Sequence, residues 1–105
     1  MSHLDYKKFR EILAELRSSL PTAYPVVVRR TTLKKSWGDC DLIGKRKKKF
    51  LIRIHKGLDR CATISILIHE YSHALSWTFE HQDLHDHGPL WAVNYGRVYQ
   101  EVMEP

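Results

Sequence analysis

The chain has 105 residues, of which 43% are hydrophobic and 28% are charged, and its formal net charge is +5. This composition is ordinary for one soluble domain, expected over residues 1–105, and no segment approaches the roughly 20 apolar residues of a membrane-spanning helix. The two cysteines form no C-x-x-C pair and the first residues contain no long apolar run, so we expect no disulfide scaffold and no secretory signal, and we expect a cytoplasmic protein.

The first predicted element is an amphipathic helix. Apolar residues recur at helical spacing from Tyr6 to Leu20, and Pro21 ends the segment. Ser2 is suited to the N-cap, with Asp5 in the capping-box position. We expect the apolar side of this helix to cover the sheet that follows.

Three strands are predicted next, over residues 24–30, 37–43 and 49–55. The first and third are rich in β-branched or aromatic residues, and the second, weaker one lies between turn signals. In the third strand Phe50, Ile52 and Ile54 alternate with other residues, so they share one face. We expect a small three-stranded sheet of the antiparallel type.

Two helices are predicted after the sheet. Asp59 is a suitable N-cap for the first, and a polar loop from Phe79 to Asp86 follows it. The last helix is expected from about Pro89 to Val102, because proline suits the first turn of a helix. Its buried stripe is predicted to consist of Trp91, Tyr95, Val98 and Val102. The order of elements predicts an α+β fold.

The most informative motif lies on the first of these two helices, where residues 69–73 read H-E-x-x-H. Residues four apart lie on one face of a helix, so His69 and His73 can bind the same ion. Glu70 projects about 100° away from His69, so it is placed to reach a water at the ion without binding the ion itself. Zinc lowers the pKa of such a water to about 7, and a carboxylate can accept its proton. We expect one zinc ion with Glu70 as the catalytic base.

The surroundings of the motif support this interpretation. Its flanking residues are apolar, and Glu70 is the only acid between Arg60 and Phe79. A glutamate in an apolar helix costs free energy unless a partner compensates for it, and a water at the ion is such a partner. The alternative is a buried helix whose histidines bond to backbone carbonyls, which leaves three polar groups at ligand spacing unexplained.

The third ligand has several candidates. Ser76 and Phe79 exclude the metzincin pattern, which has glycine and histidine at those positions. The candidates are Cys40, His81, His85 and His87. His87 is favoured because it precedes Gly88 and Pro89, which form a turn into a new helix and fix the position of the preceding side chain.

H-E-x-x-H followed about fourteen residues later by H-G-P-x-aromatic resembles the SprT-like (Spartan-type) metalloprotease domain. The matching residues here are His69, Glu70, His73, His87, Gly88, Pro89 and Trp91. The resemblance implies that His69, His73 and His87 bind zinc, that Glu70 is the catalytic base, and that a protein or peptide is the substrate. It also implies a minimal zincin fold, with which the order of predicted elements agrees. In zinc peptidases a strand beside the active-site helix pairs with extended substrate, which points to residues 49–55; the alternative is an ordinary edge strand protected by its lysines.

Peptide hydrolysis also needs stabilisation of the developing oxyanion. Zinc can supply most of this, and Tyr95, two turns beyond His87, is a candidate helper. The favoured alternative for Tyr95 is a packed core tyrosine.

Basic residues gather in the sheet region. They are Arg29, Arg30, Lys34, Lys35, Lys45, Arg46, Lys47, Lys48 and Lys49. Such clusters neutralise phosphates and give salt-sensitive affinity for nucleic acid, and Trp37, between two clusters, can stack on an exposed base. The prediction is contact with DNA through a basic hairpin, so that the peptidase acts on nucleic-acid-associated proteins. The alternative is a solubilising hairpin tip with Trp37 packed in the core.

Two rival functions use the same residues. In the first, zinc only supports folding, with Cys40 as a fourth ligand, and the basic hairpin binds nucleic acid; Glu70 argues against this, because a structural site has no use for a base. In the second, Cys40 replaces His87 in a deformylase-like hydrolase.

Overall fold

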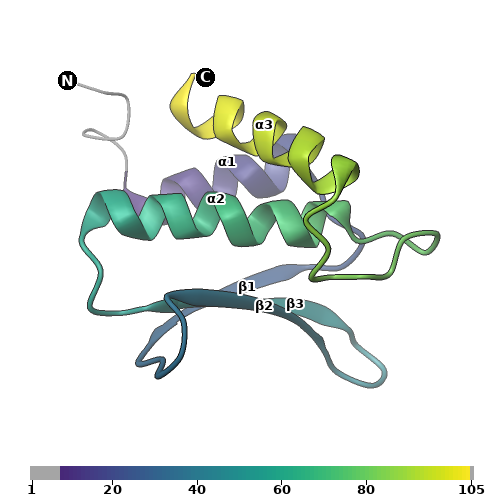
Figure 1. The fold of residues 1–105 in the computed structure, drawn as a ribbon, viewed down its shortest axis with the longest axis horizontal. Coiled ribbons are helices and arrows are strands. Elements are labelled where there is room, and N and C mark those ends of the chain that lie inside the picture. The colour runs from purple at the N-terminus through teal and green to yellow at the C-terminus, as the bar shows by residue number, and fades with distance from the viewer. Residues whose placement is uncertain (1–7, 105) are drawn as a thin grey trace.

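The computed structural model describes residues 8–104 of the chain. Its elements are, in order, α1 (Phe9–Ser19), β1 (Val26–Thr31), β2 (Gly38–Ile43), β3 (Lys49–His55), α2 (Arg60–Ser76) and α3 (Pro89–Met103). The sheet forms one layer and the helices lie on one of its faces, with α2 between the sheet and α3 (Figure 1). This arrangement confirms the predicted α+β layout. Within the described residues, no helix has the length and apolar content that crossing a bilayer requires.

The sheet is mixed, and β3 is its central strand. The strand order is β1-β3-β2; β2 pairs with β3 antiparallel, whereas β1 pairs with β3 parallel. The expected antiparallel pairing therefore holds for only one of the two strand pairs. The reason is that β3 lies between β1 and β2, so that each of its two edges pairs with a different strand. Substrate pairing by residues 49–55 is wrong for the same reason, because both edges of β3 are already paired.

One apolar core lies between α2 and the sheet and continues among the helices. The side chains of Phe50, Ile52 and Ile54 are completely buried, as their alternation predicted. The helices contribute Ile12, Leu13, Leu16, Ile64, Leu67, Ile68, Tyr71, Val98 and Val102. Burial of one such side chain stabilises the fold by about 1.5–3 kcal/mol. Of the stripe predicted on α3, Val98 and Val102 are buried, whereas Trp91 and Tyr95 are only half-buried.

The helix termini follow their local sequence. The carboxylate of Asp59 accepts a hydrogen bond from the backbone N–H of Ala62 (2.8 Å), which confirms the predicted N-cap of α2. Such a cap is worth about 1 kcal/mol. Pro89 opens α3, again as predicted. In α1 the N-cap is Lys8, and the cap expected at Ser2 lies outside the described residues.

Candidate metal centre

Three imidazoles converge beside the C-terminal half of α2. His69 and His73 lie one turn apart on α2, and His87 lies just before the first residue of α3. The Nε2 atom of His87 is 3.0 Å from Nε2 of His73 and 3.3 Å from Nε2 of His69. The structure thus brings the three predicted ligands together from two separate segments of the chain.

The spacing of these nitrogens fits a tetrahedral metal ion. Two nitrogens bound to zinc at 2.0–2.1 Å with a tetrahedral angle lie about 3.3 Å apart. The observed Nε2–Nε2 distances of 3.0 and 3.3 Å are close to that value. Hydrogen bonds alone do not explain why three such nitrogens lie together, because a neutral imidazole has only one N–H to donate. The three nitrogens could therefore hold one metal ion.

The loop before α3 holds His87 in place. The backbones of Thr78 and His81 exchange two hydrogen bonds, of 2.9 and 3.1 Å. Asp86 accepts a hydrogen bond from the N–H of Gly88 (2.9 Å), and its other carboxylate oxygen lies 3.4 Å from Nε2 of His81. The turn that carries His87 is therefore fixed on both sides.

The other candidates for the third ligand lie elsewhere. His81 faces Asp86, and Nε2 of His85 lies 3.9 Å from a carboxylate oxygen of Asp41 on β2. Cys40 is buried on β2 and is not among the clustered ligands of the described residues. Burial, reinforced by the negative charge of Glu70, raises the pKa of the Cys40 thiol far above its usual range. Because Cys40 lies outside the cluster that contains His69 and His73, His87 is the favoured third ligand.

The Glu70 carboxylate lies at the edge of the cluster without joining it. Its Oε2 is 4.0 Å from Nε2 of His69, and the residue is only 7% exposed. Burial, with the negative charges of Asp39 and Asp41 adding to it, raises the pKa of Glu70 to about 7. A carboxyl group with this pKa can both accept and release a proton near neutral pH.

The two histidines of α2 are held in the neutral form that binds metals. Burial, followed by the proximity of His87, lowers the pKa of His69. Burial, together with His69 and His87, lowers the pKa of His73 to about 4. Neither ring therefore needs to lose a proton before an ion binds at neutral pH.

Gly38 brings the outer strand β2 against this site, a role that was not predicted from the sequence. A Cβ atom at Gly38 would lie 2.3 Å from Cγ2 of Ile66 and 3.6 Å from Cγ of Glu70. A larger residue would have to displace Ile66, so Gly38 allows β2 to lie this close to the helix that carries Glu70. The sequence offered only one signal, a glycine at the start of a weak strand.

Tyr95 belongs to a row of aromatic rings along α3. Its ring centroid is 5.1 Å from that of Trp91 and 6.3 Å from that of Tyr99. Trp91 in turn contacts the imidazoles, so Tyr95 lies one ring farther from them. Its role as an oxyanion helper stays a prediction.

The basic residues form two groups at opposite ends of the sheet instead of one hairpin patch. Gly38 lies opposite Ile54, and Ile43 lies opposite Lys49, so the loop before β2 and the turn after it project from opposite ends of the sheet (Figure 1). The first group contains Arg29, Arg30, Lys34, Lys35 and Trp37, and the second is the turn 45–49. Trp37 is 60% exposed, so its alternative placement in the core is wrong.

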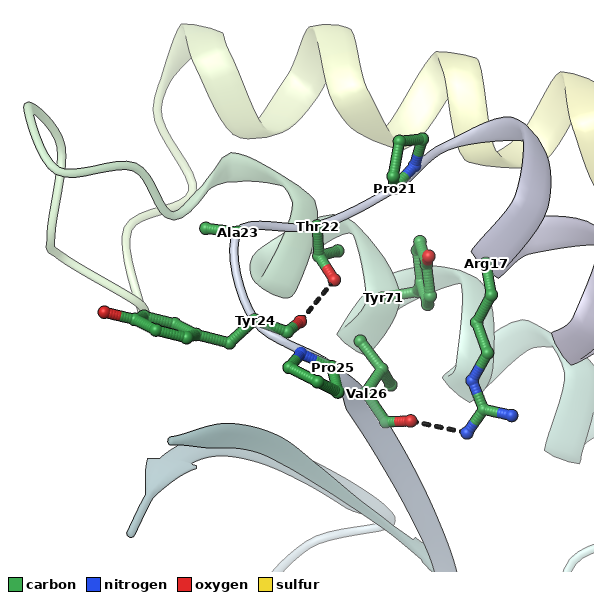
Figure 2. Close-up of a pocket in the computed structure, with 8 residues that line it drawn as sticks. All are labelled: Arg17, Pro21, Thr22, Ala23, Tyr24, Pro25, Val26 and Tyr71. Atoms are coloured by element: carbon green, nitrogen blue, oxygen red, sulfur yellow. Dashed lines mark hydrogen bonds between the residues drawn. The ribbon is translucent and has the colours of Figure 1, made fainter. Parts of the chain in front are cut away.

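A hollow of about 480 Å³ lies elsewhere on the molecule (Figure 2). It is lined by Arg17, Pro21, Thr22, Ala23, Tyr24, Pro25, Val26 and Tyr71. The side chain of Thr22 donates to the carbonyl of Tyr24 (2.6 Å), and Arg17 donates to the carbonyl of Val26. The lining contains no histidine, cysteine or carboxylate, so the hollow lacks the usual ligands of a metal site.

Comparisons with known proteins leave the site to be interpreted from its geometry. No family model matches the chain, and no curated protein and no solved structure matches it either.

Proposed function

We propose that the protein is a zinc metallopeptidase of the SprT-like type, with His69, His73 and His87 as zinc ligands and Glu70 as the catalytic base. The observation that carries this proposal is the buried Glu70 carboxylate, 4.0 Å from Nε2 of His69, beside three converging nitrogens. A structural zinc site closes the fourth position with a protein ligand and needs no base. The resemblance of the H-E-x-x-H and H-G-P segments to that family supports the same function.

The protein's own residues supply the proton transfers of the reaction. When bound, zinc would polarise the scissile carbonyl and lower the pKa of a coordinated water to about 7. Glu70 accepts a proton at its carboxylate and then delivers it to the amine that leaves. In the metal-free protein, burial raises the pKa of this carboxyl group to about 7.

The substrate is an extended peptide that pairs with β2. This strand is an outer strand of the sheet, and Gly38 brings its start next to Glu70. Backbone pairing gives affinity with little dependence on sequence. An extended peptide inhibitor is therefore expected to shift the amide signals of residues 38–43 more than those of residues 50–54. Equal shifts in both strands, or none in β2, would contradict this orientation.

The central test is Glu70→Gln. This variant is expected to keep zinc and the fold but to lose hydrolysis by a factor of about 10²–10⁴, the usual contribution of a general base. Metal content and cleavage of an unfolded protein substrate would be measured together, with and without DNA. Cleavage at the wild-type rate by a metal-clean Glu70→Gln preparation would overturn the proposal.

A second function, nucleic-acid binding, is favoured by the exposed Trp37. The indole projects at the loop before β2, its ring centroid 5.5 Å from that of His55. A hollow of about 310 Å³ beside it is lined by Leu33, Lys34, Lys35, Ser36, Trp37 and His55. An aromatic face flanked by lysines suits an unpaired base and its phosphates. We propose that DNA contacts this end of the sheet.

Two variants separate this end from the other basic group. Trp37→Ala is expected to weaken binding of single-stranded DNA about tenfold or more, and binding should weaken steeply with salt. Neutralising residues 45–49 is the matched control. This change should reduce the salt dependence of DNA binding, and at low salt it should weaken binding less than Trp37→Ala does. Binding that depends on neither Trp37 nor salt would rule out this function.

A further inference from the structure

Trp91 contacts all three candidate metal ligands at once. It lies in the first turn of α3, four residues after His87. The centroid of its ring is 5.1 Å from that of His69, 5.5 Å from that of His73 and 4.8 Å from that of His87. The imidazole centroids themselves lie 4.5–5.2 Å apart. The four rings therefore form one compact cluster in which the indole touches each of the others.

The position of the indole is not explained by its own hydrogen bonding. The Nε1 atom of Trp91 is buried and has no hydrogen-bond partner among the described residues. A buried tryptophan usually finds a partner for this group, because leaving it unpaired costs free energy. Packing against the imidazoles is thus what the placement of this ring achieves.

The helix that carries Trp91 is anchored next to the cluster. One turn farther along α3, the side-chain amide of Asn94 donates to the hydroxyl of Ser76 at the end of α2 (2.9 Å), and both residues are buried. This bond fixes α3 against α2 close to Trp91. The indole is therefore a fixed packing surface for the imidazole rings, which come from two different segments of the chain.

We propose that Trp91 is a positioning residue for the metal: its indole holds the rings of His69, His73 and His87 so that their Nε2 atoms converge before an ion binds. An imidazole free to rotate loses orientational freedom on binding, and a packing surface that restricts it beforehand lowers this cost. An indole has no lone pair for a metal, so Trp91 acts only through the ligands. The inference rests on the ligand set of the proposed function, but not on hydrolysis.

The first test measures metal affinity. Trp91→Leu is expected to weaken Zn²⁺ binding about 10–100-fold in competition with a chelator, the range typical for loss of a group that orients a ligand. Trp91→Phe, which keeps a flat ring, should recover most of the affinity. Trp37→Leu is the matched control, since the ring contact of Trp37 is with His55 and not with a candidate ligand, and it should bind Zn²⁺ as the wild type does. Equal affinity in Trp91→Leu and the wild type would overturn the inference.

The second test reads the contact directly. Co²⁺ bound by the histidines should quench the fluorescence of a nearby indole. Trp77→Phe serves as the background, because Trp77 lies one turn after His73. In that background Trp37→Phe should keep the quenching and Trp91→Phe should lose it. Quenching that persists in Trp91→Phe would contradict the placement of the ring. Circular dichroism and melting of each metal-free variant identify any loss of fold. Trp91→Met, which keeps an apolar side chain without a ring, replaces Trp91→Leu if that variant does not fold, and the same loss of Zn²⁺ affinity is expected from it.

These readouts separate the two proposals. If the wild type binds Zn²⁺ with help from Trp91 but cleaves no peptide, the proposed peptidase fails and the positioning role stands. If it cleaves peptides while the Trp91 variants bind Zn²⁺ normally, only the positioning role fails.

Discussion

Two tryptophans show how differently the two ends of this molecule are built. Trp91 packs against three imidazoles from α2 and the loop before α3, and its Nε1 is buried. Trp37 is 60% exposed on the loop before β2, among lysines that are its neighbours in the sequence. The metal end, which is the three-histidine cluster with Trp91, depends on the packing of segments that are distant in the sequence. The basic end, which is the loop before β2 with Trp37, depends on residues that are neighbours in the sequence. Changes at the metal end should therefore have larger consequences than changes at the basic end.

The largest effect is expected from His87→Ala. Loss of one of three ligands should lower Zn²⁺ affinity by more than the roughly 10–100-fold typical of a supporting group. Cys40→Ala should keep zinc, because Cys40 lies outside the ligand cluster. Metal analysis and chelator competition on both variants decide the point. Zinc lost from Cys40→Ala and kept by His87→Ala would restore the deformylase-like rival.

A second, smaller effect concerns the stability of the metal-free protein. The folded chain raises the pKa of Glu70 from its ordinary 4.5 to about 7, so folding favours the protonated carboxyl. This contribution is present in full below about pH 4.5 and is lost as the pH rises through about 7. At pH 8 with a chelator, Glu70→Gln should therefore be more stable than the wild type by about 1–3 kcal/mol.

The same measurement at low pH provides the internal control. At about pH 4.5 the wild type and Glu70→Gln should have nearly equal free energies of unfolding, because both carry a neutral side chain there. Glu80→Gln, at an exposed position in the loop after α2, should match the wild type at both pH values. Urea denaturation of all three proteins measures the differences. A Glu70→Gln variant no more stable than the wild type at pH 8 would mean that Glu70 is better solvated than its burial implies.

The contrast between local and tertiary features also explains what the sequence could predict. The positions of His69, His73 and Glu70 are set by spacing on one helix, and the Asp59 cap is set by the four residues from Asp59 to Ala62, so both were predictable. His87 needed a choice among several candidates, because its neighbours in space are eighteen and fourteen residues away.

The features that were missed depend on contacts between elements. The central position of β3 follows from which strand inserts between the others, and alternation within a strand carries no information about its neighbours. The packing surface formed by Trp91 and the close approach at Gly38 depend on how α3 and β2 meet α2. A pattern along one segment cannot specify such contacts.

The smallest effect is expected at Gly38, the residue that joins the two ends. It directly follows Trp37, and a Cβ there would lie 2.3 Å from Cγ2 of Ile66. Gly38→Ala should destabilise the protein by about 1 kcal/mol, the lower end of the usual cost of overpacking, because the nearest atom belongs to a side chain that can shift. Ile66→Ala removes the clashing atom, so the double variant should be more stable than the sum of the single changes predicts. Urea denaturation of the wild type, the two single variants and the double variant gives the coupling between the two changes in the free energy of unfolding.

The same four proteins also show whether the ends are independent. If Gly38 only sets the approach of β2 to α2, Gly38→Ala should lower the rate of hydrolysis and leave DNA binding at Trp37 unchanged, and Ile66→Ala should restore part of the rate. A loss of DNA binding that tracks the loss of hydrolysis would mean that the basic loop and the metal centre move together. Strict additivity of the two substitutions would remove the contact with Ile66 as the reason for glycine at this position, because only residues in contact are expected to couple.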